Sequence, residues 1–578
     1  MDAVAADAST DDVATDSAMD AAVDARLDAA TQDSRAADAA SDTRGPPVFP
    51  TTIRHLSVAI RTGNEVNAGG GDDPNPELEL CLNATRCFPL DVPAVDDFRR
   101  GEMDVFHFTA VGLPRSEVDR IEIRHRAGTD AVHPACVQVQ FDGEPVHCRD
   151  GIDAWLGNGA GEARSWRDPR PLTETCTTCF ASRITHGPLV GAVGPDTARV
   201  LVRTDSTRAV SLDVQPMGGG ASRRIGPLYA DPDDDFTVVF DVDGLSPRTE
   251  YTASAVLGGA RVGRVARFRT APRVGVATRF QMGFGSCAND TNFPVQPIFG
   301  EIDSRDLDLF IFAGDNHYGN TRNLQAHWWR YRNAMDMPAR AAMLAHTSVL
   351  ATWDDHDYCG NNTDRSCDAK ETVLRAFSDY WANPSYGLPM TPGVFFKTSY
   401  GDVDFFVIDD RYYRENETTG DSILGSEQAT WLFQALRRST ATFRVIVSGS
   451  TFSRGAGETW WHYPERQRLF DVIRNDNIGG VVFLAGDIHR SHFRWIHRTH
   501  YDIPELVSSG LAVHEEGTCP GPDAVEPDAR QVACTQEAPT FMQLDFDTTA
   551  MDPSILARIV DGAGRTVHQM TIRRSQLR

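Results

Sequence analysis

The chain has 578 residues, of which 41% are hydrophobic, and its formal net charge is -25 at pH 7. A chain of this size and composition can bury several cores, so we expect more than one domain and no global disorder. The negative charge argues against passive binding to nucleic acids or anionic membranes, because the field of the protein repels their phosphate groups. No stretch approaches twenty apolar residues, so the sequence predicts no transmembrane span.

The first segment, residues 1–48, consists almost entirely of Ala, Asp, Ser and Thr. It cannot bury enough apolar surface to order itself, and we expect a disordered tether that joins a folded body to a surface anchor. A plain disordered tail without an anchoring role is the alternative. The residues after Met1 do not resemble a secretory signal, so we expect the signal segment to be absent from this chain.

Two predicted β-sandwiches follow the tether. Residues 49–183 alternate short apolar and polar runs between Gly, Pro and Asp turns, which is typical of a sandwich. The order of these runs resembles a PLAT (lipoxygenase-homology) domain, which implies contact with lipids or protein partners; a lectin-like sandwich with a structural role is the alternative. Residues 184–273 repeat the β pattern, and the run from Leu245 to Tyr251 resembles a fibronectin type III domain, expected to orient the domain that follows.

The predicted catalytic domain, residues 274–578, alternates apolar runs with stretches of helical period. The helical stretches cover residues 323–347, 369–381, 426–439 and 464–475. Strands that alternate with helices predict an α/β domain of layered sheets flanked by helices. After about residue 515 the β pattern returns, and we expect these strands to complete the catalytic sheet or to cover its edge.

Six apolar runs in this domain each end in a cluster of polar residues. Short, fully apolar runs of this kind predict buried strands of a mostly parallel sheet, and ligands bind at the carboxyl ends of such strands. This regularity favours an enzyme over a binding module. The clusters contain Cys287; Asp315 and Tyr318; Asp354, Asp355 and His356; Asp409, Asp410 and Arg411; Ser448 and Ser450; and Asp487 and His489.

Ten of the eleven cysteines fall in close sequence pairs, which predicts five local disulfides in an oxidising compartment. The alternative is a set of buried, reduced thiols in a cytosolic protein. The unpaired cysteine, Cys287, lies at a predicted strand end, which suggests that it binds a metal. The pairs are Cys81 with Cys87, Cys136 with Cys148, Cys176 with Cys179, Cys359 with Cys367, and Cys519 with Cys534.

The polar clusters provide the ligand types of a two-metal site. Asp315 is the predicted bridge, because one carboxylate can span two metals. Thiolate and phenolate both stabilise ferric iron, so we expect Cys287, Asp315 and Tyr318 to bind Fe³⁺. The second cation is expected to bind Asp355, Asp487 and His489; these hard ligands favour Ca²⁺, with Mn²⁺, Mg²⁺ or Zn²⁺ as alternatives. His356 is expected to remain unligated and to protonate the leaving alkoxide or hold a phosphoryl oxygen.

Five sequence blocks, taken together and in order, resemble those of the PhoD-like alkaline phosphatases. The resemblance implies a metallophosphoesterase sheet sandwich that uses ferric iron and calcium to hydrolyse phosphomonoesters or diesters. Asn316-His317 departs from the usual pattern, which suggests that these two residues contact the substrate or add a ligand. The blocks are Gly-Ser-Cys287, Gly-Asp315-x-x-Tyr318, Thr-Trp-Asp354-Asp355-His356-Asp357, Asp-Asp-Arg411-Tyr412-Tyr-Arg414 and Gly-Asp487-Ile-His489.

The sequence therefore predicts a secreted phosphoric ester hydrolase, located outside the cell, in the periplasm or on the cell surface. Its substrate is expected to be a small phosphoester or a lipid- or nucleotide-derived one. A hydroxide held by both metals attacks phosphorus, while Arg411 offsets charge on the phosphoryl oxygens and His356 assists the leaving group. The alternatives are a surface protein with a structural metal site, whose first sandwich binds lipid, glycan or protein, and a hydrolase of other esters.

Overall fold

The computed structural model describes residues 49–62, 78–92, 98, 103–126, 131–152, 154–157, 162–168, 184–453, 459–513, 519, 525–526, 528–537 and 539–578. The predicted tether, residues 1–48, and the predicted pair Cys176 and Cys179 lie outside the described residues. Among the described helices, none is both long enough and apolar enough to cross a membrane.

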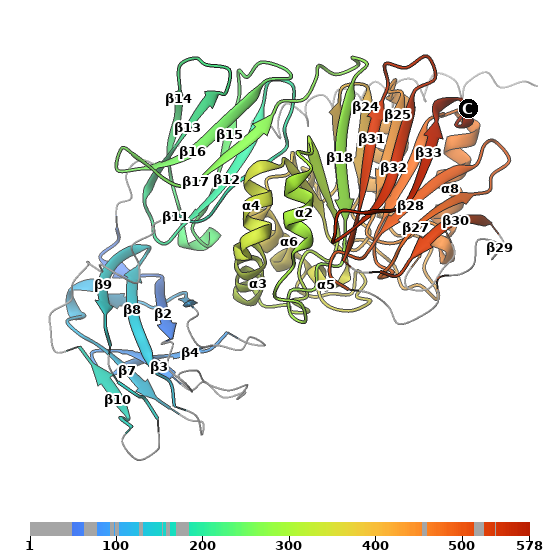
Figure 1. Ribbon diagram of the computed structural model, residues 1–578. Helices are drawn as coiled ribbons and strands as arrows, with labels where there is room; N and C mark the ends of the chain where they lie inside the picture. Colours follow the sequence, from blue (N-terminus) through green and yellow to red (C-terminus); the bar gives the residue numbers. More distant parts are fainter. Residues whose placement is uncertain are drawn as a thin grey trace, which may run out of the picture.

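The first part of the fold contains two antiparallel four-stranded sheets that share one core (Figure 1). In strand β2, Leu56, Val58 and Ile60 are fully buried in that core, whereas the alternate residues face the other way. The resemblance of this part to a PLAT domain stays a prediction. One sheet contains β5 (Met103–Phe108), β2 (Leu56–Thr62), β8 (Pro134–Phe141) and β9 (Glu144–Asp150); the other contains β10 (Ser165–Arg167), β7 (Ile121–His125), β3 (Leu78–Leu82) and β4 (Arg86–Leu90).

The second part also has two groups of strands around one core, but one group extends into the next part. Strand β11 (Ile184–Gly191) pairs in parallel with β20 (Val349–Thr352) through Gly191 and Val349. This part is therefore joined to the large sheet that follows, and its resemblance to a fibronectin type III domain stays a prediction. Its other strands are β12 (Ala198–Thr204), β15 (Thr237–Val242), β13 (Ala209–Pro216), β14 (Arg223–Tyr229), β16 (Glu250–Leu257) and β17 (Ala260–Arg269).

The third part contains two large sheets packed face to face. The nine-stranded sheet has the order β15-β12-β11-β20-β19-β18-β31-β32-β33, and the eight-stranded sheet has the order β23-β24-β25-β26-β28-β27-β30-β29. The remaining bounds are β18 (Arg279–Gly285), β19 (Leu309–Ala313), β31 (Thr540–Asp547), β32 (Ser554–Asp561) and β33 (Thr566–Arg573) in the first sheet, and β23 (Phe396–Tyr400), β24 (Val403–Val407), β25 (Phe443–Val447), β26 (Val481–Ala485), β27 (Ser491–Ile496), β28 (Ile503–Ser508), β29 (Val525–Glu526) and β30 (Ala529–Thr535) in the second.

Helices cover the outer faces of the two sheets, which gives the predicted layered α/β arrangement (Figure 1). One core cluster contains residues of both sheets and of α7 and α8, and another contains residues of the nine-stranded sheet and of the helices α2, α3, α4 and α6. The helices are α2 (Ile298–Ser304), α3 (Leu324–Asp336), α4 (Pro338–His346), α5 (Asp355–Tyr358), α6 (Lys370–Tyr380), α7 (Gly425–Arg438) and α8 (Pro464–Asn475).

Two details of this part differ from the prediction. The six apolar runs are parallel strands as expected, but three of them (β18 to β20) lie in one sheet and three (β24 to β26) in the other. The predicted helix 323–347 is two helices, because Pro338 lacks an N–H and disfavours the helical conformation at Met337, which has φ -54 and ψ 123. The expected carboxy-terminal strands do complete the sheet, with β31 antiparallel to β18.

Three disulfides follow the predicted pairing, whereas the predicted bond between Cys136 and Cys148 stays a prediction. Bonds join Cys81 to Cys87, Cys359 to Cys367 and Cys519 to Cys534, and both Cys136 and Cys148 are disulfide-bonded. Cys287 is free and buried, as the sequence predicts.

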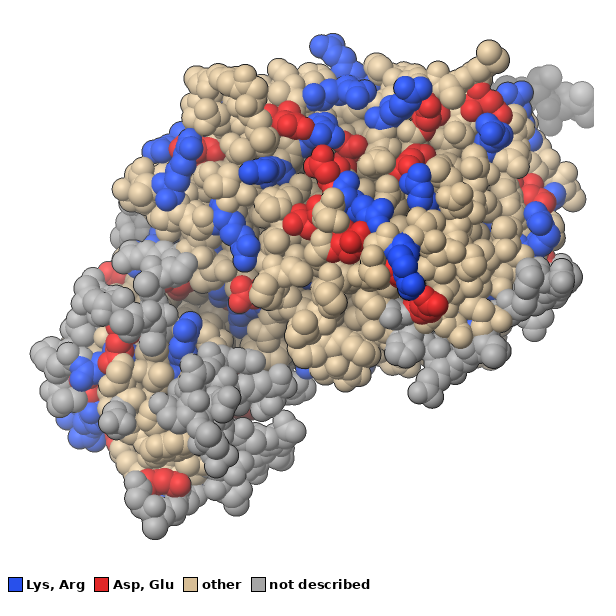
Figure 2. All heavy atoms as spheres, in the orientation of Figure 1, with Lys and Arg blue, Asp and Glu red and all other residues tan. Residues whose placement is uncertain are grey.

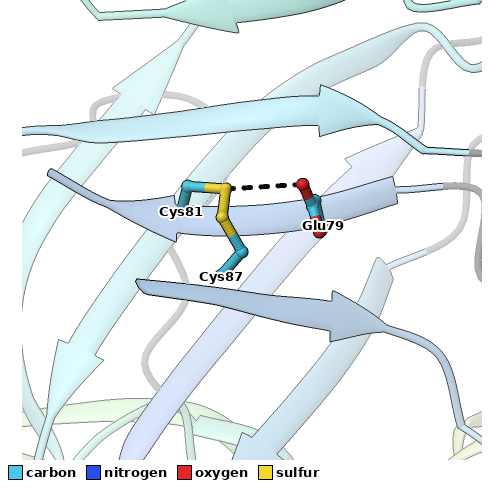
Figure 3. A group of neighbouring side chains, drawn as sticks. All are labelled: Glu79, Cys81 and Cys87. Carbon is cyan, nitrogen blue, oxygen red and sulfur yellow. Dashed lines mark hydrogen bonds between the residues drawn. A yellow bond between two sulfur atoms is a disulfide. The ribbon is translucent and has the colours of Figure 1, made fainter. Parts of the chain in front are cut away.

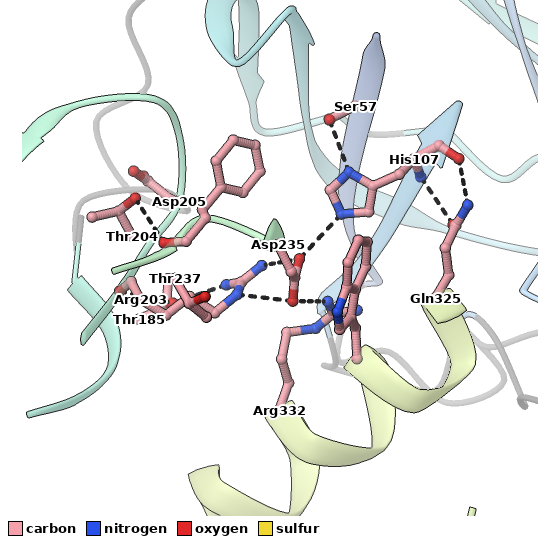
Figure 4. Close-up of polar contacts among 12 residues, drawn as sticks. Ser57, His107, Thr185, Arg203, Thr204, Asp205, Asp235, Thr237, Gln325 and Arg332 are labelled. Carbon is pink, nitrogen blue, oxygen red and sulfur yellow. Dashed lines mark hydrogen bonds and ion pairs between the residues drawn. The ribbon is translucent and has the colours of Figure 1, made fainter. Parts of the chain in front are cut away.

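The three parts meet at a buried ion-pair cluster around Asp235 (Figure 4). The carboxylate of Asp235, which is fully buried, accepts hydrogen bonds from Arg203 at 2.9 and 3.1 Å and from Arg332 on α3 at 2.6 Å. His107 on β5 lies 3.2 Å from the same carboxylate through Nε2, and the hydroxyl of Tyr380 on α6 also donates to it. This one side chain therefore ties the first sandwich and helices α3 and α6 to the second part.

Acidic and basic side chains are interspersed on the face of the molecule in Figure 2. Ion pairs among the described residues include Arg305 with Glu301 and Arg558 with Asp545. This face therefore carries no large patch of one charge that would attract a polyanion.

Candidate metal centre

The loops that follow the parallel strands of both sheets converge at one end of the sandwich. Because β18 to β20 run parallel to one another, as do β24 to β26, their carboxyl ends lie together within each sheet. Contacts cross between the sheets at this end: Arg411 after β24 pairs with Asp354 after β20 at 2.5 Å, and Ser286 N donates to Ser508 O at 2.9 Å. Two separate sheets thus build one site.

A thiol, a phenol and an imidazole surround one carboxylate in this site. Cys287 Sγ lies 3.4 Å from Asp315 Oδ2, and Tyr318 donates to the same oxygen at 3.1 Å. The phenolic oxygen of Tyr318 is also 3.2 Å from His489 Nε2. The potential ligand atoms of Cys287, Asp315 and His489 all lie within 4.8 Å of one another. We call these four residues the first ligand group.

A second group shares Asp315 with the first. The potential ligand atoms of Asp315, Asp355 and His356 lie within 4.8 Å of one another. The Asp355 carboxylate accepts from His356 N at 2.9 Å and from Asn362 N at 2.7 Å, which fixes its orientation. Asp487 completes the cluster, since its charge is near enough to raise the pKa of both Cys287 and Asp315.

The structure adds a neighbour to each of two predicted site histidines. The sequence predicts His489 beside Asp355, but the structure places its imidazole against Tyr318. His356, which is expected to remain unligated, has a ring nitrogen within 4.8 Å of carboxylate oxygens of Asp315 and Asp355. The order of residues along the chain locates strand ends but does not determine which way each imidazole turns.

The backbone is strained at four of the positions in these groups. Cys287, Asp315, Asp487 and His489 have φ values of 62°, 53°, 74° and 53°. Residues with a Cβ rarely adopt this left-handed conformation, and each instance costs on the order of 1–3 kcal/mol. Strain concentrated at the ends of three strands indicates that the fold holds these side chains in place for a function.

Burial and neighbouring negative charge raise the pKa values of several acidic groups in the cluster. The pKa of Asp315 lies well above its usual value because the carboxyl is buried and because Cys287 and Asp355 add negative charge nearby. Burial also raises the pKa of Cys287 to about 11 and that of Tyr318 well above 10. Bound cations would relieve this repulsion, so both the charge and the donor types of the cluster fit a metal centre.

Asp355 departs from this pattern. Burial alone would raise its pKa, but the positive charge of Arg411 and the side chain of His356 lower it instead. Asp355 is therefore the carboxylate of the second group that is most readily ionised.

Asp357, which the sequence did not single out, holds two of the loops together. Its fully buried carboxylate accepts hydrogen bonds from Asn316 N at 2.8 Å, His317 N at 3.2 Å and Asp354 N at 3.2 Å. Asp357 thus joins the loop that carries Asp315 and Tyr318 to the loop that carries Asp355. The only sequence signal for this role is its position as the last residue of the Asp-Asp-His-Asp run.

The three side chains that the sequence predicts to contact the substrate are buried. Asn316 donates through Nδ2 to Asp357 at 3.1 Å and to Thr352 O at 2.9 Å, and His317 is fully buried with its ring against Tyr331. Arg411 is fully buried too, and its guanidinium contacts Asp354. Burial gives these side chains little access to a bound molecule, although Asn316 Oδ1 and His317 Nε2 have no hydrogen-bond partner among the described residues, and their contact with a substrate stays a prediction.

Other predicted residues at the strand ends have structural partners. Asp409 accepts from Trp353 Nε1 at 2.8 Å and from Arg411 N at 3.0 Å, so it stabilises a turn. Ser448 donates to Asp410 at 2.8 Å and is not positioned as a nucleophile. The sequence did not single out Ser509, whose hydroxyl is 3.0 Å from Cys287 Sγ and accepts from His489 N at 2.8 Å.

His356 and Asn320 form a polar pair at the edge of the second group. The ring of His356 stacks on Tyr318 with centroids 3.9 Å apart, and its Nδ1 is 2.6 Å from Asn320 Oδ1. An oxygen acceptor at Nδ1 favours the tautomer that carries its proton there, which leaves Nε2 available for chemistry. Asn320 carries no motif that would have identified it from the sequence.

A third cluster with metal-ligand side chains lies in the first sandwich and is not a metal site. Glu79, Cys81 and Cys87 are neighbours on β3 and β4 (Figure 3). The two sulfur atoms are joined in a disulfide, so neither can act as a thiolate ligand.

Comparisons with known proteins match the part of the chain that contains the ligand groups. Residues 282–547 match the sequence model of the PhoD-like phosphatases. Alkaline phosphatase D of Bacillus subtilis (strain 168) is 26% identical over 354 residues, which are 51% of this chain and 60% of that protein. The chain therefore spans less than two thirds of the length of this curated relative.

Two solved structures share the fold. A structure of PhoD has a TM-score of 0.57 and 20% identity, and the match covers 68% of this chain and 94% of that one. A purple acid phosphatase from yellow lupin (Lupinus luteus) seeds has a TM-score of 0.54 and 10% identity, and the match covers 90% of both chains. The two packed sheets described above therefore share the fold of these two structures.

Proposed function

We propose that the protein is a phosphoric ester hydrolase of the alkaline phosphatase D type, because residues 282–547 match the sequence model of the PhoD-like phosphatases. The observation that carries the proposal is Asp315, which two groups of metal-ligand side chains share. A shared carboxylate is the arrangement that a two-metal hydrolase requires. The proposed substrate is a phosphomonoester or diester, small or derived from a lipid or nucleotide.

The two ligand groups suggest different metals. Cys287, Asp315, Tyr318 and His489 offer thiolate, phenolate, carboxylate and imidazole, a set that fits Fe³⁺. Asp315, Asp355 and Asp487 offer carboxylate oxygens, which fit Ca²⁺, with Mn²⁺, Mg²⁺ or Zn²⁺ as substitutes. When bound, two such cations supply a water of lowered pKa and stabilise negative charge on the phosphoryl oxygens.

The side chains around the ligands have supporting roles in this proposal. His356 gives a proton to the leaving alkoxide from Nε2, since Asn320 occupies its Nδ1 at 2.6 Å. Arg411 acts indirectly: its guanidinium holds Asp354 and keeps the neighbouring Asp355 ionised. Asp357 keeps the two ligand-bearing loops in register through its backbone hydrogen bonds.

Removal of the metals tests the proposed activity. The purified protein should hydrolyse p-nitrophenyl phosphate or bis-p-nitrophenyl phosphate, and incubation with a chelator should abolish the reaction. Adding back Fe³⁺ with Ca²⁺ should restore it, whereas Ca²⁺ alone should not. Undiminished turnover in a fully chelated sample would rule out metal catalysis.

A Cys287→Ser variant tests the assignment of iron. The variant should lose bound iron and the visible thiolate-to-iron absorption, because the harder hydroxyl oxygen replaces the soft ligand of the first group. The second cation should remain, since the variant keeps Asp315 and Asp355 of the second group. Metal analysis and an absorption spectrum give the result, with Ser378→Ala on α6 as control; an unchanged spectrum would remove Cys287 from the ligand set.

We also propose that the protein acts outside the cell, in the periplasm or on the cell surface. The disulfides support this location, because such bonds persist in oxidising compartments. Mass spectrometry of the secreted, unreduced protein should find Cys287 as the free thiol, with Cys176 and Cys179 bonded to each other. Several alkylated cysteines in protein that was protected from reductants would contradict this location.

A further inference from the structure

The loop that follows strand β28 brings a hydroxyl group to the first ligand group. Strand β28 belongs to the eight-stranded sheet, whereas Cys287 follows β18 of the nine-stranded sheet. Ser509, the residue directly after β28, is fully buried, and its Oγ lies 3.0 Å from Cys287 Sγ. The opposite sheet therefore places a polar group against the sulfur atom of a predicted ligand.

Backbone hydrogen bonds tie this loop to the segment that carries Cys287. Ala512 N donates to Cys287 O at 3.2 Å, and Leu511 N donates to Ser286 O at 3.1 Å. Both bonds join residues just after Ser509 to residues at the end of β18. The backbone thus holds Ser509 beside the sulfur atom.

The direction of the hydrogen bond between Ser509 and Cys287 follows from the other partner of the hydroxyl. The backbone N–H of His489 donates to Ser509 Oγ at 2.8 Å. A serine hydroxyl has one proton to donate, and Cys287 Sγ is the only other partner of this hydroxyl among the described residues. A thiolate has no proton of its own, so Ser509 is the donor whenever Cys287 is ionised.

A second hydroxyl near the sulfur atom has a competing acceptor. Ser286 Oγ lies 3.4 Å from Cys287 Sγ, but it also donates to Ser508 O at 3.2 Å. The single proton of Ser286 is therefore divided between two acceptors, whereas the proton of Ser509 has one. This difference, together with the shorter distance, makes Ser509 the main hydrogen-bond donor to the sulfur.

From this geometry we propose that Ser509 is a positioning residue of the first ligand group, because it donates a hydrogen bond to the Cys287 thiolate and holds the backbone of His489. The second contact matters because His489 has a φ of 53°, a conformation that its neighbours must stabilise. The inference rests on the proposed function, since it concerns residues expected to bind iron. A hydrogen bond to a ligand sulfur withdraws electron density and raises the reduction potential of the bound metal.

The absorption spectrum and the reduction potential of the full chain loaded with iron and calcium test the proposal. Ser509→Ala should move the thiolate-to-iron absorption band to longer wavelength, because a sulfur atom without its hydrogen bond gives up an electron more readily. The midpoint potential of the iron should fall for the same reason. Ser508→Ala is the matched control and should change neither quantity, because this neighbouring serine is equally buried and its hydroxyl has no hydrogen-bond partner among the described residues.

The outcomes separate this proposal from the proposed function. An unchanged band in Ser509→Ala, a shift to shorter wavelength or an equal shift in both variants overturns the role of Ser509. A wild type without a thiolate-to-iron band overturns it too, because Cys287 would then not be a ligand. Loss of iron from Ser509→Ala alone supports the role.

Rates with p-nitrophenyl phosphate are measured on the same samples. An inactive wild type whose band still responds to Ser509→Ala contradicts only the proposed function. An active wild type whose band does not respond contradicts only the role of Ser509.

Discussion

An Asp315→Asn variant is expected to lose phosphoester hydrolysis by about a thousandfold or more. Asp315 is shared by both ligand groups, so its replacement weakens the binding of both cations at once. Two cations contribute several kcal/mol to stabilisation of the transition state, and about 4 kcal/mol corresponds to this loss of rate. Initial rates with p-nitrophenyl phosphate, together with metal content, provide the measurement.

Two features make this variant informative. Asn is nearly isosteric with Asp, and the variant removes a buried carboxyl whose pKa is raised by burial and neighbouring negative charge. The apo protein should therefore become more stable while the activity falls, which separates a loss of chemistry from a loss of folding. Asp368→Asn, whose side chain is 82% exposed, is the matched control and should keep full activity. A rate for Asp315→Asn within tenfold of wild type would mean that Asp315 is not the bridge.

An Asp235→Asn variant is expected to lower the free energy of unfolding by about 3–5 kcal/mol. The change leaves the buried guanidinium groups of Arg203 and Arg332 without their counter-ion. Removing one partner of a buried ion pair typically lowers the free energy of unfolding by about 3–5 kcal/mol, because the other charge stays buried without compensation. The affected contacts join all three parts of the fold, so the first sandwich should also separate from α3 (Figure 4). Urea unfolding and hydrogen exchange at β5 and α3 measure the two effects.

The same cluster predicts how stability depends on pH. Burial would raise the pKa of Asp235, but Arg203 and Arg332 hold it well below the ordinary value of 3.8. Its stabilising contribution is therefore complete above that ordinary value and is lost only as the pH falls toward the lower pKa of the folded state. Asp243→Asn is the control: its pair with Arg223 is exposed, and its loss should cost less than about 1 kcal/mol. Equal destabilisation by both variants would contradict the role of Asp235.

Much of the site could be predicted because it lies at strand ends. Buried parallel strands appear in the sequence as short apolar runs. The residue after each run therefore lies at the carboxyl edge of a sheet, where ligands bind. Cys287, Asp315, Tyr318, Asp355, Asp487 and His489 were identified this way, and the structure brings them together. The division of the strands between two sheets was not predicted, because β19 and β26 are equally apolar although they join different sheets.

Side-chain direction and partners from distant segments could not be predicted. The phosphate contact of Arg411 stays a prediction, and no sequence pattern indicated that Asp354, 57 residues earlier, engages its guanidinium. Asp357 and Ser509 support the ligands through backbone groups and a hydroxyl, which carry no sequence pattern. The junction around Asp235 likewise depends on how three parts pack together, and no local period in the sequence encodes that packing.

The central claim is that one carboxylate holds two cations between the ligand groups. A crystal structure of the metal-loaded protein, with anomalous scattering measured at the iron edge and away from it, tests this most directly. We predict an iron atom bonded to Cys287 Sγ, Tyr318 and His489, a second cation bonded to Asp355, and Asp315 bonded to both. A single ion, or two ions that do not share Asp315, would contradict the account.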